Sequence, residues 1–139
     1  MAPPEVNPAK TVPSKLVLEH VSKWFQTSSL KVQALDDVTL HIAEGEFVCL
    51  VGPSGCGKST LLNLIGLIDQ PSQGAVRIEG QDTHALSDRA LTDIRFRTLG
   101  FVFQNYNLVP VLSALENVML PLQIRGAAEK QARVKAEAL

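Results

Sequence analysis

Apolar residues recur along the chain at two different spacings, which separate expected strands from expected helices. Near-alternation predicts strands at residues 16–25, 32–42 and 75–79, and short apolar runs predict buried strands at 46–51 and 99–103. Helical spacing predicts helices at residues 59–68, from 87 to about 97, from 113 to before 126, and at 127–139. Strands mixed with helices in this way indicate an α/β fold.

Capping residues and breakers refine these elements. Ser87 is expected to cap one helix, and Ser113 with Glu116 to form a reciprocal capping box at another. The last helix carries Glu129 and Arg133 at a spacing suited to an ion pair. The first two strands are expected to form an antiparallel flap before a parallel core, with 75–79 as an edge strand.

Composition narrows the possible partners. A length of 139 residues suits one domain, and a net charge of -1 indicates no nucleic-acid partner. Residues 1–14 hold four of the eight prolines and are expected to be a disordered leader. The nearly apolar stretch 108–124 is too interrupted by polar residues and prolines to span a membrane. Cys49, on an expected buried strand, and Cys56 are expected to be free thiols in a reducing compartment.

One short segment predicts nucleotide chemistry. Residues 52–59 fit the phosphate-loop pattern Gly-x-x-x-x-Gly-Lys-Ser/Thr, between an expected strand and an expected helix. Glycines let successive N–H groups point inward at phosphates, and the helix N-terminus adds partial positive charge. Lys58 supplies a charge for the β- and γ-phosphates, and the Ser59 hydroxyl is a candidate Mg²⁺ ligand. The expected nucleotide-binding residues in this loop are Gly52, Pro53, Ser54, Gly55, Cys56, Gly57, Lys58, Ser59 and Thr60.

The phosphate loop, Phe25 before it and residues 101–110 after it (Phe-Val-Phe-Gln-Asn-Tyr-Asn-Leu-Val-Pro) together resemble the nucleotide-binding domain of ATP-binding cassette (ABC) transporters. Residues 113–122 are similar to the subgroup that serves lipoprotein release and macrolide export. The resemblance covers nearly all residues from Leu16 onward. It implies a RecA-like P-loop NTPase core with an antiparallel β flap and the beginning of the ABC helical subdomain.

The resemblance also assigns roles to residues outside the loop. Phe25 would stack on adenine, with Trp24 as a neighbouring candidate, and Gln104 would be the Q-loop glutamine, a Mg²⁺ ligand near the attacking water. Lys58 and Gln104 are thus the expected catalytic residues, and ATP and Mg²⁺ the expected cofactors. The apolar residues after Gln104 resemble a surface that receives a transmembrane subunit. His20, His41 and His84 match no catalytic pattern and are expected to be structural or solvated.

Several family motifs for hydrolysis have no match in residues 1–139: the Leu-Ser-Gly-Gly-Gln signature, the Walker B strand ending in Asp-Glu, the D-loop and the switch histidine. We therefore expect the chain to be the truncated, N-terminal part of a longer ATPase. The flap and P-loop core would span about 15–104, and the Q-loop with a partial helical subdomain about 104–139. The phosphate-loop strand would then present an exposed apolar edge.

The resulting function hypothesis is the ATP-binding subunit of an ABC transporter for a lipoprotein, drug or peptide-like substrate. Its partners would be permease subunits and a second ATPase subunit, with the full-length form a homodimer. It would lie in the cytoplasm, peripheral to the inner face of the cytoplasmic membrane. A degenerate, non-hydrolysing nucleotide binder and another P-loop NTPase such as a small kinase are the alternatives, although no lid for a second substrate is recognisable.

Overall fold

The computed structural model describes residues 14–26 and 30–139, so the expected leader lies outside the described residues except for Ser14. The chain divides into two compact units, one ending at Phe101 and the other running from Val102 to Leu139. The first unit holds all the described strands, which are β1 (Ser14–Gln26), β2 (Lys31–Ala43), β3 (Gln73–Ile78) and β4 (Gln81–Asp82). Its helices are α1 (Lys58–Ile65) and α2 (Asp88–Thr98), and the second unit contains α3 (Ala114–Ile124) and α4 (Glu129–Glu137).

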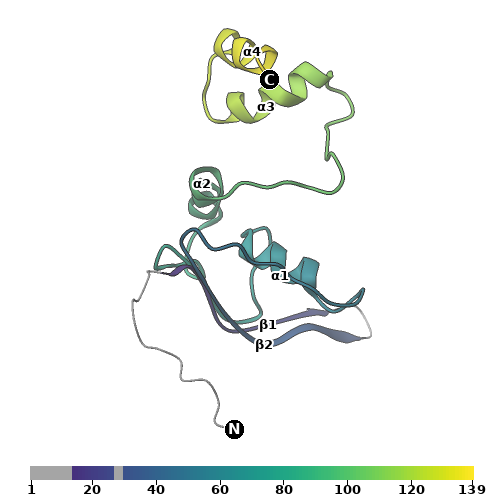
Figure 1. Cartoon of the computed structure of the whole chain (residues 1–139), viewed down its shortest axis with the longest axis vertical. Coiled ribbons are helices and arrows are strands. Elements are labelled where there is room, and N and C mark those ends of the chain that lie inside the picture. The colour runs from purple at the N-terminus through teal and green to yellow at the C-terminus, as the bar shows by residue number, and fades with distance from the viewer. Residues whose placement is uncertain (1–13, 27–29) are drawn as a thin grey trace. The chain divides into compact units, whose positions relative to one another are not determined.

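The four strands form one antiparallel sheet in the order β2-β1-β3-β4. Helix α1 lies against this sheet (Figure 1), and the apolar faces of both meet in the main core. Leu18 and Val21 of β1, Leu64 of α1 and Val76 of β3 are its fully buried side chains. The expected antiparallel flap is therefore confirmed, and it carries the core on which the phosphate-loop helix rests.

Two expected strands are absent from the described residues, because neither 46–51 nor 99–103 takes strand structure. A strand needs a neighbour to receive its backbone hydrogen bonds, and no described segment pairs with either run. Phe47 and Val51 are 93% and 89% exposed, and Cys49 is exposed rather than buried. The parallel core expected from the sequence does not form within the described part of the chain.

Strand β3 is an internal strand, not the expected edge strand. Glu79 and Gly80 both have positive φ, 51° and 78°, and turn the chain back so that Gln81 and Asp82 pair with β3. The expected helix 59–68 also ends early, at Ile65, where Gly66 is the C-cap and Leu67 has a φ of 54°. Local turns that periodicity does not encode therefore set both boundaries.

Helix α3 begins as expected, since Ser113 caps it and forms the complete capping box with Glu116. Met119 of α3 packs with Ala132 and Ala136 of α4 in a second, smaller core. The expected Glu129–Arg133 pair is wrong: Arg133 Nε instead donates to Glu137 Oε1 at 3.0 Å. Arg133 lies one helical turn from each glutamate, so spacing alone does not choose between them.

Candidate functional site

The phosphate loop of the first unit curls into the N-terminus of α1. Gly55 and Gly57 have φ values of 80° and 94°, a region that glycine enters without steric cost. Gly57 is the N-cap of α1 and provides no side-chain hydrogen bond. The first N–H groups of the helix are thus left without an intrahelical or side-chain partner, as an anion-binding loop requires.

The Lys58 side chain folds back and hydrogen-bonds to the start of its own loop. Its Nζ donates to the carbonyl oxygens of Gly52 and Pro53, both at 2.7 Å, and lies 3.5 Å from Cys56 Sγ. The ammonium group is therefore drawn back over the start of the loop rather than extended into solvent. The positive charge of Lys58 therefore lies against the loop that precedes α1.

An open cavity of about 320 Å³ lies over this loop, and six of its seven lining residues belong to the predicted nucleotide site. They are Ser54, Gly55, Gly57, Lys58, Ser59 and Thr60. The volume falls in the range of about 300–1,000 Å³ that small-molecule sites occupy. The Ser59 hydroxyl is an oxygen donor of the kind Mg²⁺ takes together with phosphate oxygens, so it fits the predicted metal role.

The seventh lining residue, Ala34 of β2, was not predicted. The β1–β2 register passes from Lys23 opposite Leu35 to Trp24 opposite Gln33, so Ala34 is the extra residue of a bulge. A Cβ on Gly57 would lie 2.5 Å from the Ala34 carbonyl oxygen, which shows how closely the two backbones approach. The sheet therefore forms one wall of the site, and only pairing register could have revealed it.

The two aromatic candidates, Trp24 and Phe25, both lie on β1. Phe25 is 44% exposed and lies opposite Val32 of β2, two residues before Ala34. Trp24 is half-buried, and the Nζ of Lys31 lies 4.1 Å from the centre of its ring. Phe25 thus has the more accessible surface, while its predicted role in stacking on adenine remains a prediction.

Gln104 belongs to the second unit, where residues 102–111 are all exposed and non-helical. Its predicted metal and catalytic roles remain predictions. Sequence reasoning missed Asn117, whose Oδ1 accepts from Val109 N at 2.8 Å and whose Nδ2 donates to the carbonyls of Leu112 and Ser113. A lone asparagine inside an apolar helix is the signal that could have identified it as the anchor of this loop.

The histidines and cysteines form no metal-type cluster in the part of the chain that the structure describes. His20 Nδ1 lies 2.7 Å from Asp37 Oδ1 on the exposed face of the sheet, consistent with a structural role. Among residues 14–26 and 30–139, no three His, Cys, Asp or Glu side chains gather as they would around a metal ion. The same residues include no helix long and apolar enough to cross a membrane. Cys49 and Cys56 are both free.

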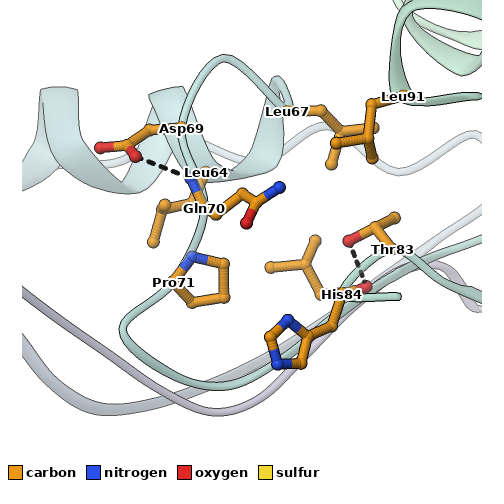
Figure 2. A pocket seen from close by; sticks show the side chains of 9 residues that line it. Leu64, Leu67, Asp69, Gln70, Pro71, Thr83, His84 and Leu91 are labelled. Atoms are coloured by element: carbon orange, nitrogen blue, oxygen red, sulfur yellow. Dashed lines mark hydrogen bonds between the residues drawn. The ribbon is translucent and has the colours of Figure 1, made fainter. Parts of the chain in front are cut away.

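A second cavity, of about 10 Å³, lies beyond the C-terminal end of α1 and has room for about one water molecule (Figure 2). Leu64, Val76 and Leu91 line it together with the buried Thr83, whose hydroxyl donates to the Val76 carbonyl. Since that hydroxyl is already bonded and the space is small, this cavity is a packing gap between the sheet and the helices.

Comparison with known proteins shows the family of this chain. The family model described as ABC transporter matches residues 35–139. The chain is 46% identical over 118 residues to the lipoprotein-releasing system ATP-binding protein LolD of Bordetella avium, covering 85% of this chain and 51% of that protein. It is 47% identical over 122 residues to the macrolide export ATP-binding/permease protein MacB of Bradyrhizobium diazoefficiens, covering 86% of this chain and 19% of that protein.

A solved structure agrees with these relatives. The ATP-binding cassette MJ0796, a protein of Methanocaldococcus jannaschii, was determined as a dimer in a post-hydrolysis state bound to ADP and Pi. The present structure matches it with a TM-score of 0.80 and 47% identity, over 88% of this chain and 54% of that one. The α/β cassette fold expected from the sequence is confirmed.

This chain spans about half the length of LolD and of the MJ0796 structure. The matched region includes the phosphate loop and Gln104, and the bulge residue Ala34 falls just before it. With the site geometry, the family model and the cassette structure in agreement, the chain belongs to the ABC transporter family and is similar to its ATP-binding proteins.

Proposed function

We propose that this chain binds ATP at the cavity over residues 52–60, as part of an ABC transporter's ATP-binding subunit. The observation that carries the proposal is a single cavity lined by Lys58, Ser59 and neighbouring residues at the N-terminal end of α1, a helix with no side-chain cap. Backbone donors at a helix N-terminus with one fixed ammonium suit a triphosphate more than an uncharged ligand.

Each residue would make a distinct contribution to binding. Lys58 would exchange its two carbonyl acceptors for phosphate oxygens, which accept more strongly because they are charged. Ser59 and Gln104 would supply oxygen ligands to Mg²⁺, which neutralises charge between the phosphates. Phe25 would offer its exposed ring surface to adenine.

The wider function is a proposal from the relatives. The similarity to LolD and MacB supports coupling of ATP binding and hydrolysis to the transport of a lipoprotein, drug or peptide-like substrate. Separate or fused permease subunits would be the partners, and the MJ0796 dimer supports a second copy of the ATP-binding subunit. The subunit would then lie at the cytoplasmic face of the membrane.

Residues 1–139 supply the phosphate cradle without a carboxylate predicted to act as general base. We therefore expect this chain to bind ATP and, by itself, to hydrolyse it negligibly. The alternative of a dedicated non-hydrolysing binder makes the same prediction for this chain. The coding sequence that follows the codon for Leu139 separates the two hypotheses, because only the transporter subunit would continue in frame into a signature motif and a strand ending in Asp-Glu.

The test is calorimetric titration of the chain with Mg²⁺–ATP. Lys58→Met removes the ammonium group and should lower the affinity about tenfold to a hundredfold, since hydrogen bonds to charged groups contribute about 1.5–3 kcal/mol. Lys130→Met, which removes an exposed lysine of α4, is the matched control and should leave the affinity unchanged. Equal affinities for wild type and Lys58→Met would contradict the proposal.

A further inference from the structure

Lys23 is a nearly buried ammonium group on β1, two residues before Phe25. Its side chain is only 12% exposed, and its Nζ donates to Asp69 Oδ1 at 2.7 Å and to the Gln70 carbonyl at 2.8 Å. The same Nζ lies over the Phe25 ring, 5.1 Å from its centre. A buried cation requires such partners, so each contact holds the other two in place.

The acceptors of Lys23 belong to the connection that follows α1. Asp69 and Gln70 lie beside Leu64 of that helix (Figure 2), and the Asp69 N–H donates back to the Asn63 carbonyl at 3.2 Å. Asp69 Oδ1 also accepts from Gln70 N at 2.7 Å, which fixes the carboxylate for Lys23. The contact made by Lys23 is therefore a contact with the C-terminal end of the phosphate-loop helix.

Neighbouring hydrogen bonds continue this attachment along β1. Ser72 N donates to the Ser22 carbonyl at 2.9 Å, and Trp24 N donates to Ser72 Oγ at 3.2 Å. The N-terminal end of α1 is held as well, because Gly57 packs closely on Ala34 and Leu35, and Leu35 is the residue opposite Lys23. The C-terminal end of α1 is thus held by β1, which carries Phe25, and its N-terminal end by the paired strand β2.

We propose that Lys23 is a positioning residue that aligns the Phe25 ring with the phosphate loop, so that base and phosphates are bound at once. This inference rests on the proposed ATP function and adds a residue that contacts no nucleotide. Lys23 covers one part of the ring, and the 44% of Phe25 that remains exposed is available to adenine. Loss of Lys23 would free the ring while leaving the phosphate cradle intact.

The experiment compares the affinities of the chain for Mg²⁺–ATP and Mg²⁺–tripolyphosphate, because their ratio reports the base-dependent part of binding. Lys23→Met should lower the affinity for ATP about tenfold, the size of a lost stacking contact, and leave that for tripolyphosphate unchanged. Lys23→Arg retains a cation for both acceptors and should preserve the ratio. The control is Lys15→Met, which also lies on β1 and removes the exposed ion-pair partner of Glu79. It should change neither the ATP affinity nor the tripolyphosphate affinity.

Asp69→Asn provides a second variant that keeps an acceptor oxygen for Gln70 N, so it should fold even if Lys23→Met does not. It should lower the same ratio by a smaller factor. The inference would be overturned if both variants left the ratio of ATP affinity to tripolyphosphate affinity unchanged, or if they weakened the binding of both ligands equally. It would also be overturned if the wild type bound ATP no better than tripolyphosphate. Failure of the wild type to bind either ligand would instead overturn the proposed function.

Discussion

Two glycines of the phosphate loop give a matched pair for testing whether the loop is shaped by backbone packing on the sheet. Gly55 and Gly57 both have left-handed φ values, 80° and 94°, so an alanine at either position carries conformational strain. A Cβ at Gly55 meets nothing within 4 Å, whereas one at Gly57 lies 2.5 Å from the Ala34 carbonyl oxygen and 2.9 Å from Leu35 Cδ2. The two variants therefore differ mainly in the collision with β2.

The expected magnitudes follow from these two contributions. A left-handed conformation costs a non-glycine residue about 1–2 kcal/mol, and this cost applies to both variants. Replacing glycine also reduces the entropy of the unfolded chain, which offsets about 0.4–1 kcal/mol at both positions alike. Overpacking against β2 adds about 1–3 kcal/mol for Gly57→Ala alone, because the obstacle is backbone and cannot change rotamer.

Urea denaturation followed by tryptophan fluorescence measures this difference directly, since Trp24 is the single tryptophan and lies on β1 of the same unit. The urea midpoint of Gly57→Ala should lie about 1 M below that of Gly55→Ala, given the usual dependence of the unfolding free energy on urea concentration. It should also weaken Mg²⁺–ATP binding more, because Ala34 lines the cavity. Equal midpoints for the two variants would refute the close approach of loop and sheet.

Four further outcomes test the packing of the helices and the cap of α3. Leu64→Ala, at a fully buried position of α1, should cost about 2–5 kcal/mol in the Trp24 urea assay. Val134→Ala, at a position of α4 that is 62% exposed, should change stability by less than about 0.5 kcal/mol. Ser113→Ala removes the cap of α3 and should cost about 1 kcal/mol, seen as lower helicity by circular dichroism. Hydrogen bonds from the Ser113 hydroxyl and then its backbone N–H hold the pKa of Glu116 below its ordinary value of 4.5. The folded state therefore favours the charged form of the Glu116 carboxyl. The stability that this charge adds to α3 should be complete above pH 4.5 and should fall as the pH drops through the lowered pKa. Glu116→Gln should remove this pH dependence of stability.

Local chemistry in the sequence was sufficient for several parts of this protein. The phosphate loop, the capping box of Ser113 and Glu116 and the alternating strands β1 and β2 each depend on residues a few positions apart. Short-range spacing is directly readable, because side-chain period and capping geometry are properties of the local backbone. The same spacing predicted a capped α2 beginning after Ser87.

Only the tertiary structure decided which segments meet. It showed that residues 46–51 have no strand partner among the described residues, that β3 is internal, and that Arg133 pairs with Glu137. It also placed Ala34 against Gly57 of the phosphate loop and Lys23 against Asp69. The two residues of each pair are at least 23 positions apart in the sequence. Such contacts depend on strand register and on where each chain segment returns to the sheet, and neither is contained in the periodicity of any single element.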